Sequence, residues 1–123
     1  MIGIGIDAVE LDRFGGALER RPRIAERLFT DGERTAMATR ANPTPGLGAR
    51  FAAKEAVLKA LGVGIGACSW HDIEVVGAGE APRLQLHGRA ASLAAELGVG
   101  SWRLSLTHTD RTAHAVAVAL ASA

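Results

Sequence analysis

The segment that most constrains the fold is residues 49–61, with the sequence ARFAAKEAVLKAL. It contains no glycine or proline, and Gly62 follows at a position where helices commonly end, so the pattern predicts a helix. Apart from its charged positions this helix is apolar all round, which predicts that it is largely buried. Unpaired charges are costly in a buried helix. We therefore expect its four charged side chains to line a cleft: Arg50, Lys54, Glu55 and Lys59.

The N-terminal segment predicts a strand that complements this helix. Isoleucine stands at positions 2, 4 and 6, and glycine at positions 3 and 5, followed by Asp7. This period of two predicts a strand with one branched apolar face and one bare face, where another backbone or a ligand can come close. Asp7 lies on the bare face. It could also be an ordinary helix N-cap or turn former, as could Glu10 and Asp12.

The remaining segments predict an α+β fold, in which helices are inserted after the first strand and between the others of a small antiparallel sheet. A capping box formed by Thr30 and Glu33 starts one of these helices. We expect helices at about residues 9–21, 23–28, 31–39 and 89–97, strands at residues 72–76, 83–87, 102–107 and 113–120, a Pro/Gly loop at residues 42–48 and a turn at residues 77–82. A chain of 123 residues fits one domain over residues 1–123.

Composition excludes several classes of function. The net charge of +1 gives no strong electrostatic case for binding nucleic acid. The single cysteine, Cys68, rules out an internal disulfide and fits a reducing compartment. The N-terminus has no basic region followed by a long apolar run, and no segment reaches the ~20 apolar residues that a membrane span needs. We therefore expect a cytoplasmic protein that does not bind membranes.

Two carboxylates from separate elements, Asp7 and Glu55, lie among several cations in this pattern. Such a set suits a site that holds a divalent metal against a phosphate-bearing ligand. Carboxylate oxygens, without cysteine or paired histidines, favour Mg²⁺ over zinc. Lys59, with Lys54 or Arg50, would offset the anionic charge. The alternative is an exposed ion pair between Glu55 and Lys59, which would contribute only about 0.2–0.5 kcal/mol.

Two further segments could contact such a ligand. Backbone N–H groups of the glycine-rich residues 62–66 could approach a phosphate or an adenine ring, although this segment is equally a helix end and a turn. His108, beside Thr107 and Thr109, could donate to a phosphate, although a lone histidine near a strand end is more often a packed or surface residue.

Arginines gather in the first third of the chain, where seven occur: Arg13, Arg20, Arg21, Arg23, Arg27, Arg34 and Arg40. A charge run of this kind is usually a solvated face, and Asp12, Glu19 and Glu26 partly neutralise it. The sharper interpretation is a docking surface for an acidic protein, since complementary charge accelerates encounter and sets the register of a complex.

Taken in order, four segments resemble the short holo-acyl-carrier-protein synthases, the group I 4'-phosphopantetheinyl transferases. They are GIGIDAVELDRF at residues 3–14, LFTDGE at 28–33, RFAAKEAVLKALGVGIG at 50–66 and SLTHT at 105–109. The resemblance implies Mg²⁺-dependent transfer of the 4'-phosphopantetheine group of coenzyme A to a serine of apo acyl carrier protein, with release of adenosine 3',5'-bisphosphate. It also implies a homotrimer with active sites at subunit interfaces. Whether the carrier belongs to fatty-acid, polyketide or peptide synthesis stays open, and fatty-acid synthesis is the first expectation.

The same resemblance implies roles for individual residues. Asp7 and Glu55 match the Mg²⁺ ligands, and Lys59 matches the lysine near the pyrophosphate. Glu55 and Lys59 are the catalytic candidates. The resemblance does not identify the base, for which our hypothesis is Glu55, directly or through a metal-bound water. Contacts to coenzyme A match Arg50, Lys54, Lys59, Gly62, Gly64, Ile65, His108 and Thr109, and carrier docking matches Arg13, Arg20, Arg21 and Arg23. One departure is Leu58, where relatives often carry serine.

Two other functions stay open at this point. The first is a catalytically idle module that binds coenzyme A or a carrier protein, against which the intact Asp7, Glu55 and Lys59 count. The second is an Mg²⁺-dependent nucleotide-phosphate hydrolase, which would release free phosphopantetheine without a carrier.

Overall fold

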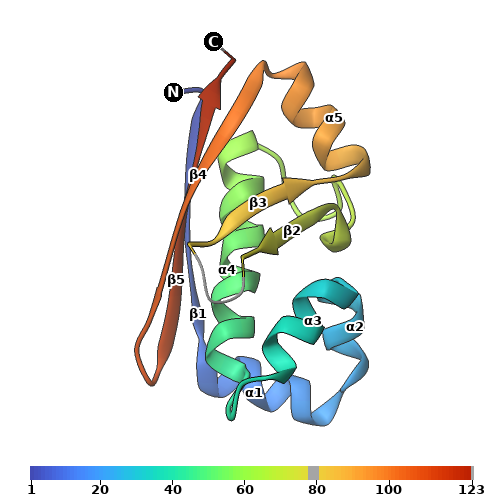
Figure 1. Ribbon diagram of the computed structural model, residues 1–123, viewed down its shortest axis with the longest axis vertical. Coiled ribbons are helices and arrows are strands. Elements are labelled where there is room, and N and C mark those ends of the chain that lie inside the picture. The colour runs from blue at the N-terminus through green and yellow to red at the C-terminus, as the bar shows by residue number, and fades with distance from the viewer. Residues whose placement is uncertain (78–80, 123) are drawn as a thin grey trace.

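Helix α4 runs through the middle of the molecule, between a three-stranded sheet on one side and a two-stranded sheet with helix α5 on the other (Figure 1). The computed structural model describes residues 1–77 and 81–122. Along the chain the elements are β1 (Gly3–Glu10), α1 (Leu11–Arg20), α2 (Arg23–Leu28), α3 (Asp31–Ala38), α4 (Thr44–Leu61), the short 3-10 helix η1 (Trp70–Asp72), β2 (Ile73–Val76), β3 (Arg83–Leu86), α5 (Gly88–Glu96), β4 (Val99–His108) and β5 (Thr112–Ala121). This arrangement confirms the predicted α+β class.

The three-stranded sheet is antiparallel with the order β1-β5-β4, and β2 pairs only with β3 among the described strands. The strands expected after the first therefore divide between two sheets rather than joining one. The three short helices α1 to α3 lie together beside the N-terminal turns of α4 (Figure 1).

Strand β1 and helix α4 touch through their backbones. A Cβ atom added at Gly3 would lie 2.0 Å from the Ala60 carbonyl oxygen, and one at Gly5 would lie 1.8 Å from the Ala56 carbonyl oxygen. No side chain fits at such distances, so glycine is required at both positions. The predicted close approach of another backbone to the bare face is therefore confirmed, and α4 supplies that backbone.

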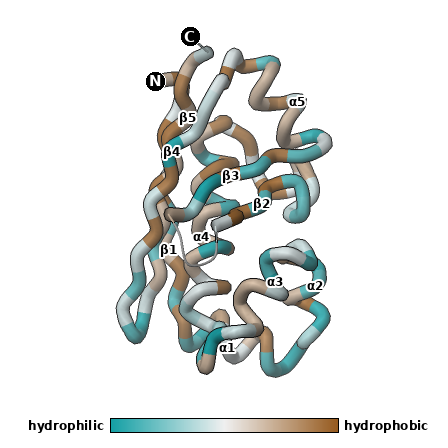
Figure 2. The backbone as a smooth tube through the Cα atoms, in the orientation of Figure 1, coloured by the Kyte–Doolittle hydropathy of each residue, from teal (hydrophilic) through white to brown (hydrophobic). Residues whose placement is uncertain are grey.

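The core between α4 and the sheet is built from small residues. Buried alanines of α4 face alternate alanines of β5: Ala52, Ala53, Ala56, Ala113, Ala115, Ala117 and Ala119. Figure 2 shows mostly tan and brown, hydrophobic residues along β5. Small side chains let helix and sheet pack closely. Side chains at the edge of α4 therefore come near strand β1.

The prediction of a loop over residues 42–48 is wrong from Thr44 onward, because α4 begins there. Pro45 lies in the first helical turn, where its missing N–H removes no helix hydrogen bond. Added Cβ atoms at Gly46 and Gly48 would lie 2.5 Å from the Met37 sulfur and 2.6 Å from a Leu11 methyl. These helical glycines thus let α3 and α1 pack against the first turns of α4.

The first strand also extends further than expected. Val9 and Glu10 pair with β5, so α1 begins at Leu11 rather than near residue 9.

The predicted capping box of α3 is confirmed, since the Thr30 hydroxyl accepts from the Glu33 N–H at 3.1 Å and a Glu33 oxygen accepts from the Thr30 N–H at 2.9 Å. Gly62 ends α4 with a left-handed φ of 72°. The expected turn over residues 77–82 falls partly on residues 78–80, which lie outside the described residues.

The face of the three-stranded sheet that points away from α4 is apolar along β1. Ile4 and Ile6 are 57% and 64% exposed there, and their cross-strand partners on β5 are Val118 and Val116. Exposed contiguous apolar surface is typical of an interaction face.

Among the described residues, no helix combines the length and apolarity that crossing a membrane would require.

Candidate active site

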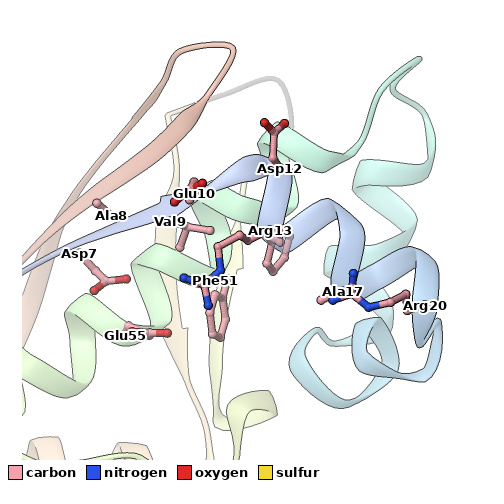
Figure 3. Close-up of a pocket in the computed structure, with 11 residues that line it drawn as sticks. Asp7, Ala8, Val9, Glu10, Asp12, Arg13, Ala17, Arg20, Phe51 and Glu55 are labelled. Carbon is pink, nitrogen blue, oxygen red and sulfur yellow. The ribbon is translucent and has the colours of Figure 1, made fainter.

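The end of β1 and the middle of α4 bring together the two predicted carboxylates. Asp7 follows Gly5 on the strand face that touches α4, and Glu55 and Lys59 lie one helical turn apart on the adjoining side of that helix. In Figure 3 the carboxylates of Asp7 and Glu55 project from different elements into the same space. The convergence predicted from two distant segments is therefore present.

Lys59 pairs with Asp7 rather than with its helical neighbour. Its ammonium donates to Asp7 Oδ1 at 2.9 Å and to the Ile6 carbonyl oxygen at 3.0 Å. The hydrogen bond and the charge of Asp7 raise the pKa of Lys59 above its ordinary value. The Lys59 side chain is 54% exposed, whereas that of Asp7 is 12% exposed. The lysine can therefore reach out of the site, while the aspartate is held in it.

The pKa of Glu55 is raised by its burial and also because a second carboxylate, Asp7, lies near it. Burial raises its pKa above the ordinary value, and the charge of Asp7 and a hydrogen bond with it raise the pKa further, while Lys59 opposes the shift. A pair of carboxylates in this state gains from any cation that binds between them.

A groove of about 740 Å³ opens beside this pair, between β1, α1 and α4 (Figure 3). Its lining includes the two carboxylates, further acidic side chains, two arginines and an apolar wall: Asp7, Ala8, Val9, Glu10, Asp12, Arg13, Phe14, Ala17, Arg20, Phe51 and Glu55. Two of the four predicted docking arginines, Arg13 and Arg20, thus share one groove with the carboxylates. The other two, Arg21 and Arg23, are exposed just beyond it.

The apolar wall of the groove is an aromatic stack. The Phe51 ring stacks on Phe14 with centroids 5.7 Å apart, and the Trp70 ring packs against Phe51 at 5.3 Å with the two planes tilted by 54°. Phe51 belongs to α4, Phe14 to α1 and Trp70 to η1. The position of this wall therefore depends on how three elements are held together.

Two carboxylates without cysteine or histidine are ligands that suit a hard divalent cation such as Mg²⁺. Within the described ranges, no group of three or more histidine, cysteine, aspartate or glutamate side chains could hold a metal. Zinc sites need three or four such ligands. Mg²⁺ commonly binds one or two carboxylates and keeps water or phosphate oxygens in its other positions. Asp7 and Glu55 are the residues that could hold it.

A second pocket, of about 240 Å³, lies at the opposite edge of the three-stranded sheet, next to β4. It is lined by Arg40, Gly46, Ala49, Arg50, Gly77, Pro82, Leu106, Thr107 and His108. Arg50 is only 5% exposed, and its Nε has no hydrogen-bond partner in the described structure. Burial lowers the pKa of Arg50, and the neighbouring Arg40 lowers it further. Two arginines without a carboxylate in the lining could bind an anion.

This geometry can be set beside known proteins. The family model of the 4'-phosphopantetheinyl transferase superfamily matches residues 3–119. The chain belongs to this superfamily. It is 50% identical over 121 residues to the holo-[acyl-carrier-protein] synthase of Moorella thermoacetica, a match that covers 98% of this chain and 93% of that protein.

Solved structures of transferases show the same fold. The holo-[acyl-carrier-protein] synthase of Neisseria meningitidis has a TM-score of 0.87 at 33% identity, covering 98% of this chain and 99% of that one. The Bacillus anthracis holo-(acyl-carrier-protein) synthase, in complex with coenzyme A, has a TM-score of 0.81 at 34% identity, covering 98% and 97%. The family resemblance read from the sequence is confirmed.

For this transferase the structure corrects the expected role of Lys54. Its side chain is 0% exposed and its ammonium bonds only to protein groups, namely Glu33 and the Trp70 and Ile73 carbonyls. Lys54 therefore lies in the interior and not in a cleft, and it is not placed to contact coenzyme A. The charged side chains of α4 therefore lie in different surroundings. The side of the helix with Lys54 is covered by η1 and β2, whereas the side with Glu55 faces the groove.

The remaining predicted contacts are dispersed. Gly62, Gly64 and Ile65 lie past the end of α4, where Ile65 is 74% exposed and a Cβ at either glycine would meet nothing within 4 Å. Thr109 uses its hydroxyl to hold the β4–β5 turn, accepting from the Thr112 N–H at 3.1 Å.

Sequence reasoning missed Arg40 and Phe14 as site residues. Arg40 was one of seven arginines in a run, and only the turn of chain before α4 brings it beside Arg50. Phe14 carried a signal, since it lies in the motif that contains Asp7 and repeats with Leu11 and Leu18 at helical spacing, but this spacing indicated only a packed face.

Proposed function

We propose that this chain transfers the 4'-phosphopantetheine group of coenzyme A to a serine hydroxyl of apo acyl carrier protein and releases adenosine 3',5'-bisphosphate. The observation that carries the proposal is the meeting of Asp7, Glu55 and Lys59 beside one groove with Arg13 and Arg20, in a chain of this superfamily. The first three suit a pyrophosphate, and the arginines suit an acidic protein. The products would be carrier proteins for fatty-acid or polyketide synthesis.

In this reaction the serine oxygen forms a bond to the β-phosphorus of coenzyme A, and the bond from that phosphorus to the bridging oxygen breaks. The serine proton needs an acceptor, for which we propose Glu55. Glu55 lines the groove that the serine would enter, so its carboxylate could accept this proton directly or through a water. The exposed ammonium of Lys59 can stabilise the charge that develops on the departing phosphate.

The cofactor that we propose is Mg²⁺, with Asp7 and Glu55 as its ligands. When bound, it supplies positive charge against the pyrophosphate oxygens. The raised pKa of Glu55 supports this assignment, because a cation between the two carboxylates would relieve their repulsion. Lys59 would then be free to turn from Asp7 toward the phosphates.

The carrier protein would dock along α1 and the start of α2. Arg13 and Arg20 line the groove itself, while Arg21 and Arg23 extend the positive surface beyond it. An acidic carrier would be steered to this surface, and its serine would enter the groove beside Glu55.

Coenzyme A would use the second pocket for the nucleotide end. Arg50, Arg40 and His108 offer donors to a phosphate, with no carboxylate among the lining residues. The open segment at residues 62–66, including Gly62, Gly64 and Ile65, remains a proposed contact, as does Thr109. Lys54 is not among them.

A homotrimer would complete this site. Strand β5 separates β1 from β4, so the groove and the pocket of one molecule lie at opposite sheet edges. Copies packed through the apolar face with Ile4 and Ile6 would bring the pocket of one near the groove of another. We propose this trimer, with sites between subunits, and a cytoplasmic location.

The decisive experiment is the intact mass of an apo acyl carrier protein after incubation with this protein, coenzyme A and Mg²⁺. We expect a gain of one phosphopantetheine arm, lost with a chelator and with Asp7→Ala. No gain across fatty-acid and polyketide carriers, despite binding of coenzyme A, would instead support an idle binding module.

A further inference from the structure

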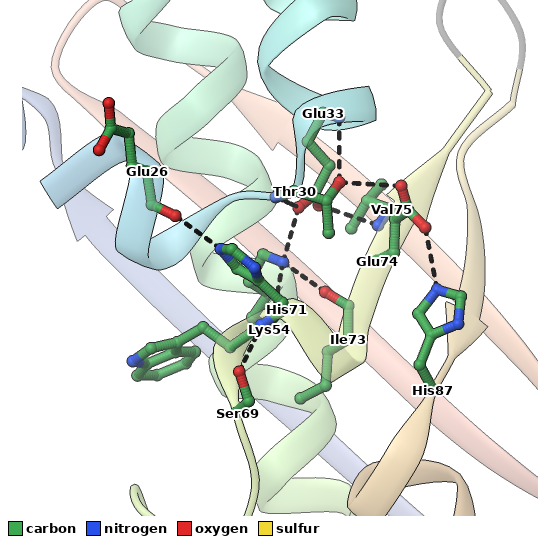
Figure 4. A network of polar contacts seen from close by, with 11 residues as sticks. Glu26, Thr30, Glu33, Lys54, Ser69, His71, Ile73, Glu74, Val75 and His87 are labelled. Atoms are coloured by element: carbon green, nitrogen blue, oxygen red, sulfur yellow. Dashed lines mark hydrogen bonds and ion pairs between the residues drawn. The ribbon is translucent and has the colours of Figure 1, made fainter. Parts of the chain in front are cut away.

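Lys54 anchors helix α4 to the layer that covers it (Figure 4). Its ammonium donates to Glu33 Oε1 at 2.8 Å, to the Trp70 carbonyl oxygen at 3.0 Å and to the Ile73 carbonyl oxygen. These three acceptors use all three donors of the ammonium group. The helix is thus tied at one point to α3, η1 and β2.

Glu33 is equally saturated on its side of the pair. One of its oxygens accepts from Lys54 and from the Thr30 N–H, and the other accepts from the Val75 N–H at 2.9 Å. Glu33 is 1% exposed. A single carboxylate therefore joins the start of α3, the strand β2 and the helix that carries Glu55.

This anchor acts on the groove in two ways. Lys54 and Glu55 are consecutive, so their side chains project about 100° apart on the helix, and fixing the direction of one fixes that of the other. The same ammonium holds the Trp70 carbonyl, and the Trp70 ring supports Phe51, which lines the groove with Glu55. Rotation of α4 about its axis would break three directional hydrogen bonds.

We propose that Lys54 is a positioning residue for the transfer reaction: through Glu33, Trp70 and Ile73 it sets the rotation of α4 that presents Glu55 to Asp7 and seats Phe51. The proposal rests on the proposed function. A buried ion pair often stabilises a fold no more than apolar residues of similar volume do. The pair of Lys54 and Glu33 is therefore better explained by the orientation that it gives to α4 than by a gain in stability.

The test compares three variants of the full chain. Glu33→Gln combined with Lys54→Met removes both buried charges and leaves a side-chain amide oxygen at position 33 as an acceptor for the α3 cap. Lys54→Arg keeps the charge but not three convergent donors. Glu74→Gln is the matched control, because Glu74 belongs to the outer part of the same network, bonded to Thr30 and His87, and makes no hydrogen bond to α4 in the described structure.

The readout is the affinity for Mn²⁺, measured by calorimetry with coenzyme A bound and no carrier present. We expect the double variant to bind Mn²⁺ about 10–100-fold more weakly, as for other residues that orient metal ligands. Lys54→Arg should fall between it and the parent, and Glu74→Gln should keep the parent's affinity while losing thermal stability. A folded double variant with the parent's Mn²⁺ affinity and kcat would overturn the proposal.

A crystal structure of the double variant gives a second readout that needs no metal. We expect α4 to be rotated, with Glu55 turned from Asp7, and an unrotated helix would overturn the proposal. A parent that binds no Mn²⁺ contradicts the proposed metal site instead, and the crystal structure then decides the role of Lys54. A parent that binds Mn²⁺ but transfers nothing contradicts only the function.

Discussion

The groove beside β1 and the pocket beside β4 differ in whether their charged side chains are paired. In the groove, Asp7 is already paired with Lys59, and acidic and basic side chains share the lining. In the pocket, Arg40 and Arg50 share a lining that contains no carboxylate, and a buried guanidinium nitrogen of Arg50 has no partner in the described structure. The groove therefore balances most of its charge within the protein, whereas the pocket leaves positive charge that the proposed nucleotide phosphate would offset.

The largest effect is expected from Glu55→Gln. Because it removes the proposed base and a metal ligand, turnover should fall by roughly 10²–10⁴-fold. Metal-free stability should rise slightly, since the variant loses the repulsion from Asp7 that raises the pKa of Glu55. Mass spectrometry of the carrier and thermal unfolding measure the two effects. Glu10→Gln, in the same groove, is the control, and equal losses in both variants would refute the special role of Glu55.

The next largest effect concerns the scaffold of the groove. Gly5→Ala should destabilise the fold by about 3 kcal/mol, because the new methyl group would collide with the Ala56 carbonyl oxygen and force β1 from α4. Urea unfolding measures this. Gly64→Ala is the matched control, since an added Cβ there meets nothing. Similar stabilities for the two variants would show that α4 and β1 can separate without cost.

A smaller effect is expected in the pocket. Arg50→Gln should raise the KM for coenzyme A by about tenfold or more, in line with the ~1.5–3 kcal/mol of a hydrogen bond to a charged group. The stability of the fold should be little changed or improved. The variant no longer buries a charged guanidinium beside Arg40, and these are the two causes that lower the pKa of Arg50. Steady-state kinetics checks this, with Arg40→Gln expected to act in the same direction. An unchanged KM would contradict the proposal that the nucleotide end of coenzyme A binds in this pocket.

The smallest effect is a pH dependence confined to the groove. A carboxyl whose pKa is raised on folding favours the folded state below its unfolded pKa and loses that contribution as the pH rises through the folded pKa. Stability of the metal-free protein should therefore fall as Glu55 ionises. Thermal melts across acidic pH should show the stability of the parent falling relative to that of Glu55→Gln, because Glu74, whose pKa is lowered chiefly by a hydrogen bond with His87, acts in the opposite direction in both. Added Mg²⁺ should reduce this relative fall.

Much of the groove could be predicted from the sequence because its determinants are local. The alternation that ends at Asp7 and the spacing of Glu55 and Lys59 each fix a face of one element, and the glycines at positions 3 and 5 indicate which faces meet. The resemblance to the transferases then supplied the chemistry.

The rest depends on which layer covers each side of α4. The sequence alone does not distinguish Lys54 from Lys59, because both are lysines on an otherwise apolar helix. Only the tertiary fold shows that backbone carbonyls of Trp70 and Ile73 surround the Lys54 ammonium, while solvent reaches Lys59. The first turns of α4 were missed for a related reason, since Gly46 and Gly48 indicate a loop until their contacts with α3 and α1 are known.

The bond between Lys59 and Asp7 has a consequence for the molecule without the proposed Mg²⁺. The Lys59 ammonium already offsets the charge of Asp7, although that charge still raises the pKa of Glu55. If Mg²⁺ binds as proposed, loading would replace one cation beside Asp7 by another. We therefore expect the empty protein to stay folded, with Lys59 acting as a resident counter-ion until the metal displaces it.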